Sequence, residues 1–255
     1  MVKGNGKMES MKIGIQLYTV REALKADYRG VLRELAKLGC EGVEFAGNFG
    51  GMEPAELTAF LRETGLACCG IHASAAELAD PAARVYDYAE ALGARYVTFS
   101  HCGKYPGILD ECIRECAAAG KTAASKGLGF TYHNHACEFA EQDGIPCLDR
   151  ILAATDPQKV GMELDVCWAA KAGADPVEYI GKYRNRLPQI HMKDFNPADG
   201  SFTELGSGCV DLAACAEAAK ESACKWLIYE QDACARPPLE SAGLSIAFLR
   251  KLLNR

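Results

Sequence analysis

This 255-residue sequence lacks the features that mark a secreted, membrane-spanning or nucleic-acid-binding protein. Its first ten residues are polar and contain no apolar stretch of the kind found in secretory signal peptides. No segment approaches the roughly 20 apolar residues that a membrane-spanning helix needs. The net charge of −6 provides no general excess of positive charge to neutralise phosphates. These absences predict a cytoplasmic protein with no membrane or nucleic-acid partner.

The thirteen cysteines do not follow the pattern of a disulfide-bonded scaffold or a zinc motif. Their number is odd, no C-x-x-C pair occurs, and several cysteines lie within apolar segments. We therefore predict free thiols that pack as small apolar side chains in a reducing compartment.

Strand-like and helix-like segments alternate from residue 11 to the end of the chain. Strands are expected over residues 12–17, 42–45, 66–71, 95–99, 129–133, 160–164, 187–192 and 226–229. Helices are expected near residues 21–38, 54–64, 75–92, 108–126, 145–154, 176–183, 212–222 and 239–253. Four of these helices are followed by a glycine of the type that ends helices: Gly39, Gly65, Gly93 and Gly127.

Eight strand–helix units imply a parallel sheet, because each crossover between parallel strands needs a connecting helix. An open, doubly wound sheet would be expected to carry a glycine-rich phosphate turn after its first strand, and residues 16–19 (QLYT) form no such turn. We therefore predict an α/β fold in which residues 11–255 form a single (β/α)8 TIM barrel. Residues 1–10 are predicted to be a short disordered leader.

All five histidines lie at or just after the end of an expected strand: His72, His101, His133, His135 and His191. Strand-end carboxylates, including Glu44, Asp165 and Glu230, belong to the same rim. Active sites of TIM barrels are assembled at this face. Imidazoles combined with carboxylates are the ligands that divalent transition ions prefer. The sequence therefore predicts a metal site at the carboxyl ends of the strands.

The predicted ligands of one divalent ion are Asp165, His191, Glu230 and a fourth residue from the segment 129–139 (GFTYHNHACEF). Glu138 is the more natural electrostatic partner for a cation, whereas His133 is better placed at the strand end. Mn²⁺ is the preferred ion, and Zn²⁺, Co²⁺, Fe²⁺ and Mg²⁺ are alternatives.

Side chains around this ion are given roles in proton transfer and substrate binding. Glu230, His133 and His135 are predicted to move protons, since imidazole titrates near neutral pH. Lys193 is predicted to bind a substrate oxygen or polarise a carbonyl. The predicted substrate contacts are Gln16, Glu44, His72, His101 and Trp168.

Four further segments complete a resemblance to the xylose-isomerase-like barrel superfamily, which includes ketose 3-epimerases, inosose dehydratase and endonuclease IV. They are residues 164–168 (LDVCW), 190–194 (IHMKD), 205–211 (LGSGCVD) and 229–232 (YEQD). The resemblance implies a Mn²⁺-type site with Glu, Asp, His and Glu ligands, of which Asp165, His191 and Glu230 match the last three. His133 stands where the epimerases have a glutamate, and residues 132–139 look more like the branch of inosose dehydratase and lyases of 3-keto sugars.

The resulting prediction is a metal-dependent isomerase, epimerase or lyase that acts on a keto sugar through an enediolate. One alternative is a DNA-repair nuclease like endonuclease IV, although Trp168 stands where that enzyme has a histidine. The other alternative is a metal-free, non-catalytic sugar-binding barrel. A homo-oligomer is compatible with each of these functions.

Overall fold

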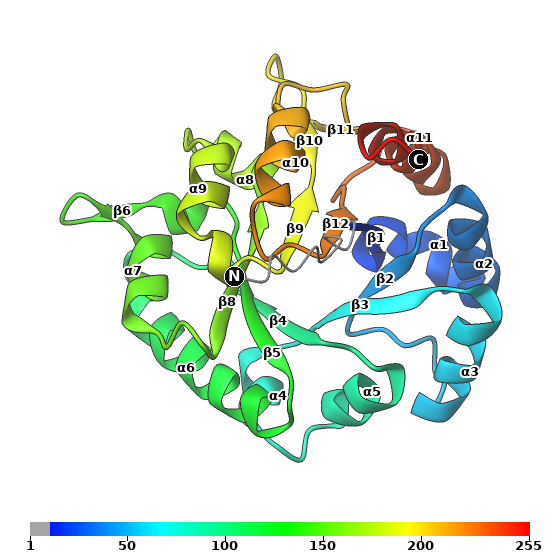
Figure 1. Ribbon diagram of the computed structural model, residues 1–255, viewed down its shortest axis with the longest axis horizontal. Coiled ribbons are helices and arrows are strands. Elements are labelled where there is room, and N and C mark those ends of the chain that lie inside the picture. Colours follow the sequence, from blue (N-terminus) through cyan, green and yellow to red (C-terminus); the bar gives the residue numbers. More distant parts are fainter. Residues whose placement is uncertain (1–10) are drawn as a thin grey trace, which may run out of the picture.

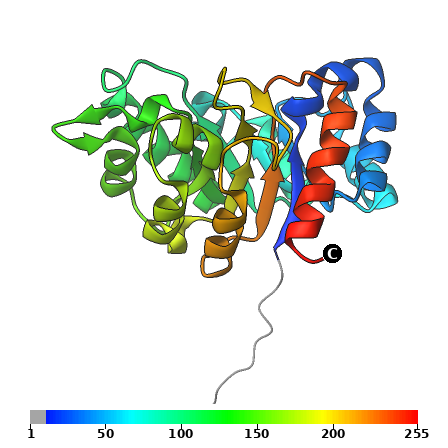
Figure 2. The ribbon, with the colours of Figure 1, turned by 90° about the horizontal axis from the view of Figure 1, so that it is seen from above.

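Eight parallel strands close into a barrel in residues 11–255, the part of the chain that the computed structural model describes (Figure 1). The barrel strands are β1 (Lys12–Gln16), β2 (Gly42–Ala46), β3 (Ala67–His72), β4 (Tyr96–Ser100), β5 (Gly129–His133), β8 (Val160–Asp165), β9 (Gln189–Met192) and β12 (Trp226–Tyr229). The first strand pairs with the last, and Figure 2 shows β1 beside β12. The predicted (β/α)8 barrel is confirmed, and the predicted leader at residues 1–10 lies outside the described residues.

Helices surround the strands (Figure 1). The α-helices are α1 (Arg21–Ala26), α2 (Tyr28–Leu38), α3 (Pro54–Thr64), α4 (Ala75–Ala79), α5 (Arg84–Leu92), α6 (Leu109–Ser125), α7 (Cys147–Ala154), α8 (Val166–Lys171), α9 (Pro176–Lys182), α10 (Leu212–Lys220) and α11 (Pro238–Leu252). Three short 3-10 helices are η1 (Leu17–Val20), η2 (Cys137–Phe139) and η3 (Arg184–Arg186). None of the helices in residues 11–255 combines the length and the apolar character needed to cross a membrane.

Two expected helices are each divided into two by local chemistry. The helix expected over residues 21–38 breaks at Asp27, whose side chain accepts the backbone N–H of Gly30 and so starts α2 as its N-cap. The helix expected over residues 75–92 breaks at Asp80 and Pro81. Since proline has no backbone N–H and restricts the residue before it, the helix ends there. The four expected helix-ending glycines all have positive φ, as predicted.

Two small hairpins leave the barrel, and neither was expected from the sequence. One pairs β6 (Glu141–Gln142) with β7 (Ile145–Pro146), and the other pairs β10 (Asp194–Phe195) with β11 (Phe202–Thr203). The β11 strand of the second lies in the segment 196–208, which the sequence predicts to be an irregular loop. All thirteen cysteines are free, and most are buried, which confirms the prediction of unpaired thiols.

The interior of the barrel is polar, whereas TIM-barrel interiors are usually filled with branched apolar side chains. Glu44 on β2 contacts Gln189 on β9, with Gln189 Nε2 3.2 Å from Glu44 Oε1. Because β1 and β12 separate these two strands in the barrel order, the contact crosses the interior. Thr98 and Thr131 bond to each other through their hydroxyls at 2.8 Å. These buried polar groups therefore satisfy one another inside the barrel.

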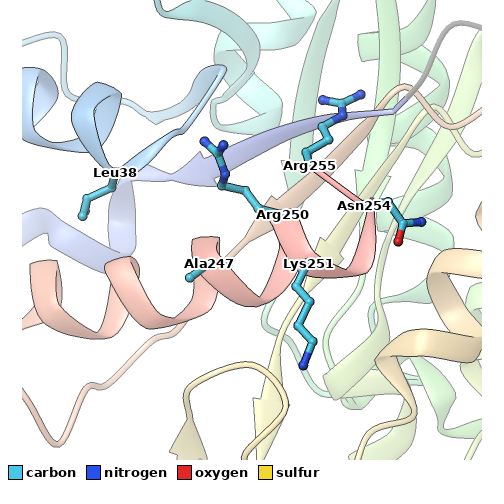
Figure 3. A pocket seen from close by; sticks show the side chains of 6 residues that line it. All are labelled: Leu38, Ala247, Arg250, Lys251, Asn254 and Arg255. Carbon is cyan, nitrogen blue, oxygen red and sulfur yellow. The ribbon is translucent and has the colours of Figure 1, made fainter.

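A hollow of about 580 Å³ lies between α2 and α11, away from the predicted site (Figure 3). It is lined by Leu38, Ala247, Arg250, Lys251, Asn254 and Arg255. Arg255 donates to the carbonyl oxygen of Met11, so this hollow is at the end of the barrel where β1 begins. Its lining contains no histidine, cysteine or carboxylate side chain, so it offers no side-chain ligand of the type expected for a transition ion.

Gly70 faces the polar interior, and we expect that no larger residue fits there. A Cβ atom at Gly70 would lie 2.5 Å from Glu44 Oε1 and 2.9 Å from Gln189 Nε2. We expect Gly70→Ala to lower the free energy of unfolding by about 1–3 kcal/mol, because an added methyl group would push these buried groups apart. Gly181→Ala is the control, since nothing lies within 4 Å of its Cβ position. Chemical unfolding measures both variants, and equal stability of the two would contradict this account.

Candidate active site

Buried imidazole and carboxylate side chains gather in two adjoining groups that share His191. The inner group is Glu44, His72, Glu163 and His191, and the outer group is His133, Asp165, His191 and Glu230. In each group, one donor atom per residue lies within 4.8 Å of the others. Glu163 and Asp165 both come from β8, where residues two apart face the same side. The strand ends that the sequence singled out therefore do converge.

The donors of the inner group are already bonded to one another. His72 Nε2 lies 2.8 Å from Glu163 Oε1 and 3.2 Å from Glu44 Oε2. Burial lowers the pKa of His72, but Glu44 and Glu163 outweigh burial and raise it to about 10. The imidazole is thus held as a cation between two carboxylates. This group satisfies its own hydrogen-bonding and charge requirements.

The outer group contains buried atoms that have no hydrogen-bond partner. They are both ring nitrogens of His133 and Oδ2 of Asp165. Burial lowers the pKa of His133 well below its ordinary value, and His191 and His135 add to the effect, so its imidazole is neutral. Neutral imidazole is the form that binds metal ions. Since unpaired buried polar atoms are rare, these donors fit a divalent cation.

The charge balance around the outer group also fits a cation. Four carboxylates are buried here, those of Glu44, Glu163, Asp165 and Glu230. Lys193 Nζ lies 3.2 Å from Glu230 Oε2 and 3.5 Å from Asp165 Oδ2, and it also pairs with Asp232. Burial lowers the pKa of Lys193, but these three carboxylates outweigh burial and raise it, so the side chain is charged. A divalent ion would balance further negative charge at this position.

The orientation of His191 links the two groups. Its Nδ1 atom lies 3.0 Å from Glu230 Oε2 in the outer group. Its Nε2 atom lies 2.7 Å from Glu44 Oε2 and 3.0 Å from Glu163 Oε1 in the inner group. Metal-binding histidines usually donate their other ring N–H to a carboxylate. The inner carboxylates therefore fix the ring so that Nδ1 faces the outer group.

Two predicted substrate contacts, Gln16 and Glu44, have other partners in the structure. Glu44 is fully buried and holds His191, while Gln16 Nε2 donates to Glu44 Oε2 at 2.8 Å. Both side chains therefore support the inner group from within the barrel. The sequence placed them at the correct face but gave no information on their depth.

Glu138 is not part of the outer group, although the sequence offered it as a metal ligand. Its carboxylate accepts hydrogen bonds from the Tyr132 hydroxyl at 2.8 Å and the His135 backbone N–H at 2.9 Å. His135 Nδ1 lies 3.9 Å from the same carboxylate. Burial lowers the pKa of His135, but Cys102 and Glu138 outweigh burial and raise it to about 10. Glu138 thus fixes the His135 loop, whereas His133, the alternative candidate, is the fourth member of the outer group.

The remaining predicted contacts lie around the rim. His72 is the one partly exposed member of the two groups, with 18% of its side chain accessible. His101 is half-buried and lies edge-on against Phe99, with ring centroids 5.9 Å apart. The Trp168 ring lies 5.7 Å from His135 and 5.2 Å from Phe202 between centroids. Of these three, His72 lies against His133 in the outer group, with ring centroids 5.4 Å apart, and Trp168 lies beside Lys193.

Two residues important to the site were not proposed from the sequence as site residues. Glu163 belongs to the inner group, and its position two residues before Asp165 was the available signal. Asp194 is fully buried, and its carboxylate accepts the backbone N–H groups of Phe195, Gly206, Gly208 and Val210 at 2.9–3.0 Å. It therefore organises the long loop after Lys193.

Comparison with known proteins identifies the family to which this barrel belongs. Residues 32–252 match the family described as Xylose isomerase-like TIM barrel. The chain belongs to this family. Inosose dehydratase from Lacticaseibacillus casei is 25% identical over 205 residues, which cover 66% of this chain and 68% of that protein. The predicted superfamily is thus confirmed.

Solved structures share the fold of this xylose isomerase-like barrel. A sugar phosphate isomerase/epimerase from Parabacteroides distasonis has a TM-score of 0.79 at 22% identity, with 98% of this chain and 96% of that chain covered. The IolI protein, solved with a bound zinc atom, has a TM-score of 0.78 at 14% identity, with 96% and 98% covered.

The role of Asp194 can be tested by removing its carboxylate. Asp194→Ala leaves four backbone N–H groups without their acceptor, and we expect a loss of roughly 2–4 kcal/mol in the free energy of unfolding. Amide hydrogen exchange at Gly206, Gly208 and Val210 should become faster. Asp211→Ala is the control, because this exposed aspartate accepts a single N–H, from Ala214, at the start of α10. Unchanged exchange in the Asp194 variant would contradict the assignment.

Proposed function

We propose that this xylose isomerase-like barrel is a metal-dependent enzyme that removes a proton next to the carbonyl of a keto sugar. The observation that carries the proposal is the outer group, in which buried atoms of His133 and Asp165 without a hydrogen-bond partner lie close to His191 and Glu230. The names of the relatives support the substrate class, since they include inosose dehydratase and sugar phosphate isomerase/epimerase. The product would arise by isomerisation, epimerisation or elimination.

The proposed ligands are His133, Asp165, His191 through Nδ1, and Glu230. Mn²⁺ remains the preferred ion, and the zinc atom of the IolI structure supports a divalent metal. When bound, such an ion supplies a Lewis acid that polarises a carbonyl and stabilises the enediolate formed on proton removal. Glu44 and Glu163 hold the ring of His191 for this purpose.

The proton-transfer groups differ in chemical type, which favours elimination over epimerisation. An epimerase of the two-glutamate type uses one carboxylate to remove a proton and another to return one. Here Glu230 offers a carboxylate, whereas His133 and His135 offer imidazoles whose rings lie 5.1 Å apart. We propose that Glu230 accepts the proton and that His135 protonates a departing hydroxyl, which leaves as water. Lys193 holds a substrate oxygen through its ammonium group.

Metal analysis of the purified protein tests the proposed centre. We expect one ion per chain, lost in Asp165→Ala and His133→Ala because each removes a ligand. Glu138→Gln is the matched variant, since it changes the other candidate ligand while keeping its shape, and it should retain the ion. The reverse result would restore Glu138 as the ligand. About three ions per chain would favour the nuclease alternative, and none would favour a metal-free sugar-binding barrel.

The reaction class can be tested with the Mn²⁺-loaded protein. Keto sugars, 3-keto-glycosides and inosose are the substrates to screen. Elimination should produce an enone or diketone with the loss of one water, which mass spectrometry detects as a decrease of 18 mass units. Incorporation of deuterium from solvent without a change in connectivity would instead show epimerisation.

A further inference from the structure

We propose that Trp168 and Phe202 form a binding wall for an uncharged, ring-shaped sugar or cyclitol, and that the Trp168 indole N–H donates to one of its hydroxyls. The inference rests on the proposed function and specifies the kind of substrate that the same site takes. It concerns the side of the site formed by α8 and the β10–β11 hairpin.

The wall is fixed to the outer group by the start of α8. Asp165 is the N-cap of this helix, and its Oδ1 atom accepts the backbone N–H of Trp168 at 2.8 Å. The same carboxylate therefore offers Oδ2 to the proposed metal and sets the position of the tryptophan. A ligand held by Asp165 would lie close to the indole.

The two rings stand beside the charged centre of the site. Trp168 and Phe202 meet edge to face, with centroids 5.2 Å apart and an interplanar angle of 79°. Lys193 Nζ lies 5.1 Å from the Trp168 ring and 4.8 Å from the Phe202 ring. Because Lys193 also contacts Asp165 and Glu230, the rings form one side of the outer group.

The wall is held in place before any ligand binds. Phe202 belongs to the β10–β11 hairpin, whose base is fixed by the hydrogen bonds of Asp194. Lys171 on α8 donates to the carbonyl oxygen of Gly200 and lies 5.0 Å from the Phe202 ring. These contacts connect the hairpin to the helix that carries Trp168. A pre-organised wall of this kind binds without the entropic cost of ordering a loop.

The indole N–H of Trp168 is a buried donor that has no acceptor among the residues that the structure describes. Trp168 Nε1 is buried and has no hydrogen-bond partner, although buried indole N–H groups usually find one. A substrate hydroxyl would supply the missing acceptor. Aromatic faces pack against the C–H groups of a sugar ring, so the combination of an apolar wall and one N–H donor fits a polyhydroxylated ring.

The charges of the wall argue against a phosphorylated substrate. Lys193 already pairs with Asp165, Glu230 and Asp232, and Lys171 donates to Gly200. Three carboxylates therefore already balance the charge of Lys193, so its ammonium group can donate to a neutral substrate oxygen but does not offset the added charge of a phosphate, and the ammonium group of Lys171 is held by a backbone carbonyl. A phosphate group here would face carboxylates, and like charges at close range repel.

The fluorescence of the protein can report on this wall directly. Trp168 and Trp226 are the two tryptophans of the sequence, and Trp226 lies at the start of β12, at the other end of the barrel. The Mn²⁺-loaded native protein and its Trp226→Phe variant are titrated with inosose as the uncharged ring and with fructose 6-phosphate as the phosphorylated probe. We expect inosose to change the emission of both proteins saturably and to bind at least 10-fold more tightly than fructose 6-phosphate.

Substitutions separate the contribution of the Trp168 N–H to binding from that of the aromatic rings. Trp168→Phe keeps an aromatic wall but removes the donor, and we expect the Kd for inosose, measured by calorimetry, to rise about 10-fold. Phe202→Ala should raise it similarly. Trp226→Phe is the matched control and should leave Kd unchanged. Metal content and melting temperature are measured for each variant, because a purely structural role would lower stability without changing Kd.

The outcomes distinguish this inference from the proposed function. If inosose binds by calorimetry without changing Trp168 emission, or binds Trp168→Phe with the same Kd, Trp168 does not form part of the binding site. Tighter binding of fructose 6-phosphate, or no binding of inosose to the metal-loaded protein, would overturn the substrate class. None of these results affects the metal analysis of His133→Ala and Asp165→Ala, which judges the proposed centre independently.

Discussion

The centre of the barrel depends on His191, both of whose ring nitrogens face buried carboxylates. Contacts of 2.7–3.0 Å connect this one imidazole to Glu44 on β2, Glu163 on β8 and Glu230 after β12. Burying these charges is costly unless each is paired, so the surrounding interior has to be polar. Gln16, Gln189 and the Thr98–Thr131 pair occupy positions that branched apolar side chains fill in most TIM barrels. The same buried polar contacts therefore stabilise the interior of the barrel and set the geometry of the site.

The same constraint separates the inner group, whose polar atoms bond to one another, from the outer group, where some polar atoms have no partner. In the inner group, two carboxylates and two imidazoles contact one another, and none of their buried side-chain atoms lacks a hydrogen-bond partner. In the outer group, the burial that keeps His133 neutral also leaves its nitrogens without partners. Compared with a glutamate at the same position, the neutral imidazole of His133 lowers the negative charge of the outer group by one. Burial raises the pKa of Glu230, but Lys193 and His191 outweigh burial and hold it well below its ordinary value, so this carboxylate is ionised at neutral pH.

The sequence predicts the strands and the rim but not the depth or the partner of each side chain. Apolar segments and helix-ending glycines are patterns of neighbouring residues. They are therefore sufficient to predict the eight strand–helix units and the convergence of the histidines. The helix break at Asp27 depends on a side chain that competes for a backbone N–H. The depth of Glu44 depends on contacts with β9, which is 145 residues away in the chain. Glu138 and His133 are five residues apart, and only the structure shows that the Tyr132 hydroxyl donates to the Glu138 carboxylate while both ring nitrogens of His133 have no hydrogen-bond partner.

Lys193 and Asp194 show how two adjacent residues connect the buried centre to the long loop that follows them. Successive residues of an extended chain face opposite sides, so Lys193 faces the carboxylates of the outer group while Asp194 faces the loop. Gly208 is required by this arrangement, because a Cβ there would lie 2.2 Å from Asp194 Oδ1. The loop in turn carries Phe202 to the Lys193 ammonium group. Changes within residues 196–203 can therefore alter the proposed wall without disturbing His191, since the connection between them passes through two anchored side chains.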